Sequence, residues 1–162
     1  MRFRDLQSTD ICRTQEEIHG GKTMKYDKYK NMTALRFYAL SFTWGLPMSL
    51  IGCIVCLALM CAGFKPKRYG HCICIEIGKG WGGVNLGWLL LSEKGGGASV
   101  KNHELGHAYQ NACLLGWVMP IFSIISAIRY WYDRLFKRID YYAWWFEADA
   151  SEIGNYIMKE VD

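Results

Sequence analysis

Two histidines and a glutamate near the middle of the chain have the types and spacing of a metal-dependent hydrolase. His103, Glu104 and His107 form the pattern H-E-x-x-H. On a helix, positions i and i+4 lie on one face, so the two imidazoles can bind one ion. Glu104 lies about a third of a turn from His103 and can act as general base on a zinc-activated water without ligating the metal. The pattern indicates a zinc metallopeptidase; the alternative is a pair of surface histidines beside an ordinary glutamate.

A catalytic zinc usually has three protein ligands, so one more donor is needed. A C-terminal helix is expected over residues 141–159, and it carries Glu147, Asp149 and Glu152. We favour Glu147, because it follows an aromatic run that places it where this helix meets the core. Asp149 lies about 200° round the helix from Glu147, so the two carboxylates cannot face the same ion. Asp149 and Glu152 are the alternatives.

Two further polar side chains are candidates for holding the ligands in place. Ser151 lies four residues after Glu147, shares its helix face and could hydrogen-bond a ligand imidazole. Gln110 lies about one turn beyond His107. It could orient a ligand or a substrate, or it could only hydrogen-bond inside a membrane-facing helix.

The segment before the motif is expected to form a short β-hairpin. Residues 69–77 alternate and are β-branched, and residues 84–91 follow a glycine-rich turn. The free edge of a strand beside an H-E-x-x-H helix could pair with an extended peptide or protein substrate. The alternative is a hairpin that only covers the helix.

A long uncharged stretch indicates a membrane protein. No residue from position 37 to 64 is charged. This stretch is longer than the roughly 20 apolar residues that a helix needs to span a membrane. We therefore predict a transmembrane helix over 37–64, which starts or kinks near Pro47. Five Lys and Arg residues lie at positions 22–36, just before this stretch, and three at 65–68, just after it, which favours a cytoplasmic N-terminus of an integral cell-membrane protein.

A second uncharged stretch over 108–128 directly continues the H-E-x-x-H helix. Pro120 and several polar residues weaken it as a span, so it could cross the membrane, dip into it or form a buried core helix. In the first two cases the metal site would lie at the membrane surface or just inside it.

Composition and length indicate which partners and which division into segments to expect. The chain has 162 residues and a net charge of +4 without a compact basic patch, so we expect no nucleic-acid partner. The expected fold is mainly α (α+β), with a polar N-terminal tail over 1–36, the span over 37–64 and a zincin-like metal-binding domain over 65–162. We expect the protein to be embedded in the lipid bilayer. Because the chain is short for an autonomous peptidase, a homo-oligomer could complete the cleft.

Six sequence blocks, in order, resemble a family of small bacterial membrane proteins. The family pattern H-E-[FY]-G-H-x-x-Q is followed downstream by W-x-E-x-x-A-[ST/DN]-x-x-G, and Leu105 stands here where the family usually has an aromatic residue. The blocks are TWGLP at 43–47, KPKRYG at 65–70, GWGGVNLG at 80–87, NHELGHAYQN at 102–111, SAIRYWY at 126–132 and WFEADASEIG at 145–154. The pattern falls on His103, Glu104, His107, Gln110, Glu147, Ala150, Ser151 and Gly154.

The arrangement is also similar to that of the gluzincin peptidases, in which a glutamate on a later helix is the third zinc ligand. Many gluzincins carry an acid four residues after that glutamate, where this chain has Ser151. The resemblance implies a membrane-associated zinc metallopeptidase that hydrolyses peptide bonds. The alternative is a non-catalytic, metal-stabilised membrane scaffold or pseudo-protease.

Overall fold

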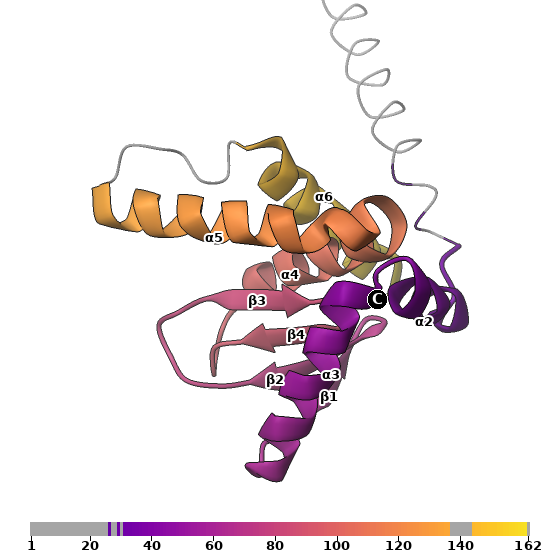
Figure 1. Cartoon of the computed structure of the whole chain (residues 1–162), viewed down its shortest axis with the longest axis horizontal. Helices are drawn as coiled ribbons and strands as arrows, with labels where there is room; N and C mark the ends of the chain where they lie inside the picture. Colours follow the sequence, from indigo (N-terminus) through magenta and orange to yellow (C-terminus); the bar gives the residue numbers. More distant parts are fainter. Residues whose placement is uncertain (1–25, 27–28, 30, 137–143, 162) are drawn as a thin grey trace, which may run out of the picture. The chain divides into compact units, whose positions relative to one another are not determined.

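The computed structural model describes residues 26, 29, 31–136 and 144–161. The chain divides into two units, Met1–Met32 and Thr33–Asp162, and every helix and strand from residue 34 onward belongs to the second (Figure 1). Most of the expected N-terminal tail over 1–36 lies outside the described residues. The same is true of positions 141–143, where the C-terminal helix was expected to begin.

The long uncharged stretch forms two helices, α2 (Ala34–Thr43) and α3 (Leu46–Cys61), which meet at an angle of 102°. Thr33 caps α2 by accepting a hydrogen bond from the N–H of Arg36. Pro47 lies in the first turn of α3, where its missing N–H costs nothing. The predicted break near Pro47 is confirmed, and the segment is not one straight helix. Its crossing of a membrane stays a prediction.

A four-stranded mixed sheet follows, in the order β1-β2-β4-β3. The strands are β1 (Lys67–Tyr69), β2 (Cys72–Glu76), β3 (Gly83–Leu86) and β4 (Leu89–Ser92). β2 and β4 are parallel and the outer pairs antiparallel. The expected hairpin is therefore part of a larger sheet, because a tight turn at Gly87 splits the single strand expected over 84–91 into β3 and β4. Gly87 has φ +72°, a conformation that glycine adopts without strain.

One nearly continuous helical path carries the H-E-x-x-H motif. Helix α4 (Ala98–Gln110) passes through a π turn (Asn111–Leu115) and a 3-10 turn (Gly116–Val118) into α5 (Met119–Phe136). By length and composition, Ala98–Phe136 is the one helix in the described part of the chain that could cross a membrane, or one of two if α2 and α3 form a single span.

Helix α4 packs on β3 and β4 with one side and on α6 (Trp145–Val161) with another (Figure 1). Two glycines allow α4 and α6 to approach until their backbones touch. A Cβ atom at Gly106 would overlap the carbonyl group of Ala150, and one at Gly154 would overlap the carbonyl group of Asn102. This contact is polar at its edge, where the Asn102 amide donates to Oδ1 of Asn155 at 2.9 Å.

Two apolar clusters join the remaining elements. Cys56 of α3 packs on Ile75, Leu89 and Leu91 of the sheet, and Met48 of α3 meets Met119 and Phe146 where α5 and α6 begin. The expected class, mainly helical α+β with a histidine-histidine-glutamate group across two helices, is confirmed.

We expect Gly154→Ala to destabilise the fold by about 3 kcal/mol or more, because the new methyl group meets backbone that cannot move aside. Gly97→Ala is the matched control, since a Cβ atom at Gly97 meets nothing within 4 Å. Its effect should stay within about 0.5 kcal/mol. Thermal unfolding of the detergent-purified proteins measures both. Equal midpoints would show that α4 and α6 do not need this close approach.

Candidate metal centre

Three ligand atoms from two helices converge on one point. Nε2 of His103 lies 3.0 Å from Oε2 of Glu147, Nε2 of His107 lies 3.1 Å from the same oxygen, and the two Nε2 atoms are 3.1 Å apart. A tetrahedral metal ion with bonds of about 2.0–2.1 Å needs donor atoms roughly 3.3 Å apart. The three atoms therefore form a nearly equilateral triangle of the size that such an ion requires, and the group could hold a metal ion.

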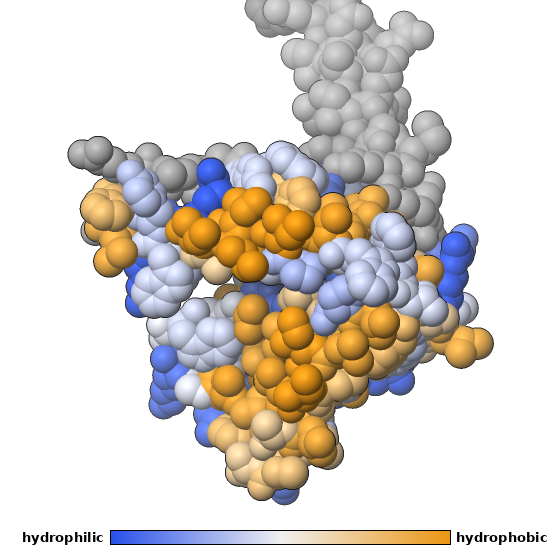
Figure 2. Space-filling view, in the orientation of Figure 1, coloured by the Kyte–Doolittle hydropathy of each residue, from blue (hydrophilic) through white to orange (hydrophobic). Residues whose placement is uncertain are grey.

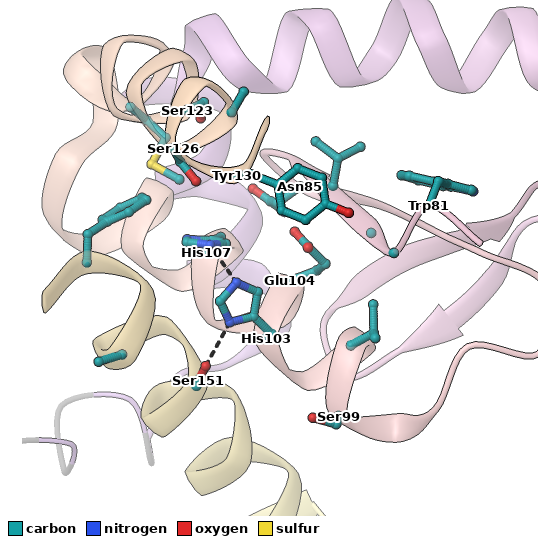
Figure 3. Close-up of a pocket in the computed structure, with 18 of the residues that line it drawn as sticks. Trp81, Asn85, Ser99, His103, Glu104, His107, Ser123, Ser126, Tyr130 and Ser151 are labelled. Carbon is teal, nitrogen blue, oxygen red and sulfur yellow. Dashed lines mark hydrogen bonds between the residues drawn. The ribbon is translucent and has the colours of Figure 1, made fainter. Parts of the chain in front are cut away.

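The tautomer of His103 follows from its partner on α6. The hydroxyl of Ser151 donates to the backbone oxygen of Glu147 at 3.1 Å, so it must accept from Nδ1 of His103, 2.8 Å away. The imidazole of His103 lies between Ser151 and His107 (Figure 3). With its proton on Nδ1, His103 presents the lone pair of Nε2 to the centre of the triangle.

His107 is oriented in the same way by Gln110. The Gln110 amide nitrogen donates to the backbone oxygen of Phe146 at 3.0 Å and to Oδ2 of Asp149 at 3.2 Å. Its amide oxygen is thus left to accept from Nδ1 of His107 at 2.8 Å. Both sequence candidates for ligand support, Ser151 and Gln110, therefore lie against an imidazole.

The three converging atoms are all acceptors in these tautomers, so a cation is needed among them. Glu147 is fully buried, and an unpaired carboxylate there would be costly. Burial by itself would raise the pKa of Glu147, so its carboxylate stays ionised only with hydrogen-bond donors or a positive charge beside it. An ionised carboxylate beside two imidazole lone pairs is a donor set that fits a divalent metal ion.

Glu104 lies beside the imidazoles of His103 and His107 (Figure 3), but it is not one of the three residues of the triangle. Burial raises its pKa to about 7; nearby Glu147 adds to this rise, while His103 and a hydrogen bond from the backbone of Asn85 oppose it. Gly83 makes room for this side chain, since a Cβ atom there would lie 2.8 Å from Cγ of Glu104. Helix α4 and strand β3 thus hold Glu104 between them.

The triangle opens into a cavity of about 620 Å³. Its walls come from β3 with the preceding loop, from α4, from the inner face of α5 and from the start of α6. The described residues that line it include His103, Glu104, His107, Trp81, Gly83, Asn85, Ser126, Tyr130 and Phe146. A metal ion bound at the triangle would therefore be reached from this cavity.

The structure separates the three acidic candidates for the third ligand. Glu147 is at the triangle, Asp149 lies against Gln110, and Glu152 is exposed on α6. Sequence reasoning missed Ser126, whose hydroxyl donates to Oε1 of Glu147 at 2.5 Å. It also missed the backbone N–H of Asn85. A serine inside an apolar segment is the signal that could have indicated the first, because polar groups in such segments tend to be functional.

Comparisons of this chain with protein-family models, with curated proteins and with solved structures found no match. The function is therefore inferred from the geometry of the centre.

We expect His103→Ala and Glu147→Ala each to lose the bound metal, because two remaining ligands hold an ion far more weakly than three. Glu152→Ala is the control on the same helix and should keep the metal content of the unchanged protein. Elemental analysis of detergent-purified protein measures the ratio of metal to protein. Full metal content in Glu147→Ala would remove this residue from the ligand set.

Proposed function

We propose that the protein is a membrane-associated zinc metallopeptidase. The observation that carries the proposal is the convergence of His103, His107 and Glu147 beside a buried Glu104 at the wall of a cavity. We also propose membership of the small bacterial membrane protein family with the H-E-x-G-H-x-x-Q pattern. In support, both halves of that pattern supply residues to this one centre.

Zinc is the metal that the donor set favours. Two imidazole nitrogens and one carboxylate oxygen are typical of catalytic zinc sites, whereas calcium and magnesium prefer oxygen donors. The separations of 3.0–3.1 Å between the donor atoms also suit its short bonds better than those of calcium.

The role proposed for Glu104 follows from its position. A bound zinc ion would act as a Lewis acid that polarises a peptide carbonyl and makes water a better nucleophile. Glu104 faces the same cavity as the imidazoles, so its carboxylate can take a proton from the attacking water and pass it to the leaving amine. Its hydrogen bond from the backbone of Asn85 holds the carboxylate in place for both transfers.

The outer edge of β3 is the proposed binding edge for an extended peptide. Leu86 pairs with Leu89 across the turn, and the N–H of Glu93 bonds to the oxygen of Gly82. Because hydrogen-bonded and non-bonded pairs alternate, the backbone groups of Gly83 and Asn85 point away from β4. The N–H of Asn85 already donates to Glu104, so the other backbone groups of this edge are the ones proposed to pair with a peptide. Gly83 and Asn85 both line the cavity, so a peptide that pairs with this edge would pass beside Glu104 and the imidazoles.

Membrane association is supported by the exposed side chains of two helices. Apolar residues gather on the surface over α5 and α3 (Figure 2). They include Ile121, Ile124 and Ile128 of α5 and Leu50, Ile54 and Leu57 of α3, each more than half exposed. Only 22% of the apolar window within Ala98–Phe136 is buried, whereas a core helix would be mostly buried. We propose that these two faces lie in lipid.

We expect Glu104→Gln to keep the metal and to lower peptide hydrolysis by a factor of about 10² to 10⁴, because the amide cannot accept the proton. Glu152→Gln, on an exposed position of α6, is the matched control and should cleave at the unchanged rate. Cleavage by the detergent-purified, zinc-loaded protein is measured with fluorescence-quenched peptides. One set has apolar residues in the middle of the peptide and the other has polar residues there.

The scaffold alternative makes the opposite prediction for the same pair of variants. A metal-stabilised scaffold would bind zinc in the unchanged protein and cleave no peptide, with or without Glu104. That outcome would overturn the peptidase while leaving the metal site intact.

The double variant Ile121→Lys/Ile124→Lys should lose most of its resistance to extraction from membranes by alkaline carbonate. Each lysine in the bilayer centre costs about 2.5–3.5 kcal/mol. Leu35→Lys is the control, because Leu35 is exposed at the start of α2 beside Arg36, where a further cation is tolerated. If the double variant stays in the membrane as firmly as the control, the outer face of α5 does not lie in lipid.

A further inference from the structure

The two carboxylate oxygens of Glu147 have different surroundings. Oε2 faces the Nε2 atoms of His103 and His107 at 3.0 and 3.1 Å, and Oε1 accepts the hydrogen bond from Ser126 at 2.5 Å. An ionised carboxylate can only accept, and a hydroxyl has one proton, so this proton is directed to Oε1. One oxygen of Glu147 is thus occupied on the side away from the imidazoles.

Ser126 reaches Glu147 from a third helix. It is buried, and it lies on the inner face of α5, between the exposed Ile124 and Ile128 in sequence. A serine in an apolar helix commonly bonds a carbonyl of its own helix one turn earlier. Here its hydroxyl reaches the carboxylate of Glu147, a residue 21 positions further along the chain. The hydrogen bond therefore serves the contact between α5 and the ligand on α6.

We propose that Ser126 is a positioning residue that makes Glu147 a one-oxygen ligand. The hydroxyl of Ser126 holds Oε1 and leaves only Oε2 to bind the metal. This inference rests on the proposed metal site, but not on its peptidase activity. It assigns a role to each supporting side chain: Ser151 orients His103, Gln110 orients His107, and Ser126 orients Glu147.

The hydrogen bond from Ser126 would limit the coordination number of the bound metal ion. Without the hydroxyl, the carboxylate can rotate until both oxygens approach the ion, which raises the number of ligand atoms and occupies space that a substrate would need. A catalytic site must keep one position open, so a fixed one-oxygen glutamate preserves it. The loss of a hydrogen bond to a ligand typically weakens metal binding by about 10- to 100-fold.

The test compares Ser126→Ala with Ser123→Ala in the detergent-purified full chain. Ser123 lies three residues earlier on the same helix and lines the same cavity, so the control removes the same atom from the same wall. Zinc affinity is measured by competition with a chromophoric chelator. We expect it to fall about 10- to 100-fold in Ser126→Ala, to stay unchanged in Ser123→Ala and to recover in Ser126→Thr, which keeps the hydroxyl.

Cobalt(II) substitution supplies a second readout that a merely structural role would not change. Its visible absorption is intense in four-coordinate sites and weak at higher coordination. We expect a weaker absorption per bound cobalt in Ser126→Ala than in the unchanged protein and in Ser126→Thr. If Ser126→Ala does not fold, Ser126→Cys, which keeps the volume but donates weakly, should show the same two changes to a smaller extent.

The outcomes separate this inference from the proposed function. If the unchanged protein binds zinc, His103→Ala does not, and Ser126→Ala matches the unchanged protein in affinity and cobalt spectrum, then the role of Ser126 is wrong and the metal site stands. If the unchanged protein binds neither zinc nor cobalt, the metal site itself is wrong and the role of Ser126 falls with it.

Discussion

The contact between α4 and α6 is the constraint on which the centre depends. Gly106 and Gly154 let the two helix backbones touch, and this short distance brings the carboxylate of Glu147 within 3.1 Å of both imidazoles. With side chains between the helices, Glu147 would be too far from His103 and His107 to share an ion with them. The same two helices also carry Gln110 and Ser151. The three proposed ligands and two of their three supporting side chains therefore belong to this one pair of helices.

The charge balance of this contact explains why the three residues could hold a metal ion. Glu147 is buried, and the imidazoles that face it present lone pairs rather than N–H groups. A buried carboxylate in such surroundings is unfavourable unless a cation joins it. A single divalent ion satisfies all three donors at once, which a proton shared between two of them cannot do.

The two faces of helix α5 have different environments. Its outer face carries exposed isoleucines, and its inner face places Ser126 and Tyr130 at the cavity. The polar residues that make 108–128 a weak membrane span are therefore not scattered at random. Ser126 at least is directed to Glu147. A segment with this pattern suits a helix that lies against lipid on one side and against a metal site on the other.

Local spacing was enough to predict part of this arrangement. The face shared by His103 and His107 follows from helix geometry alone, and so does the separation of Glu147 from Asp149. The break near Pro47 follows from its missing N–H and its ring. These features depend on neighbours within a few residues, which is why the order of amino acids by itself determined them.

Only the tertiary structure decided the features that join distant segments. The parallel pairing of β2 with β4, the split of 84–91 at Gly87 and the hydrogen bonds from Ser126 and Asn85 link residues that no periodicity relates. Whether a serine reaches a ligand on another helix depends on which backbones approach closely, and Gly106 and Gly154 set this distance for Ser151 of α6 and His103 of α4.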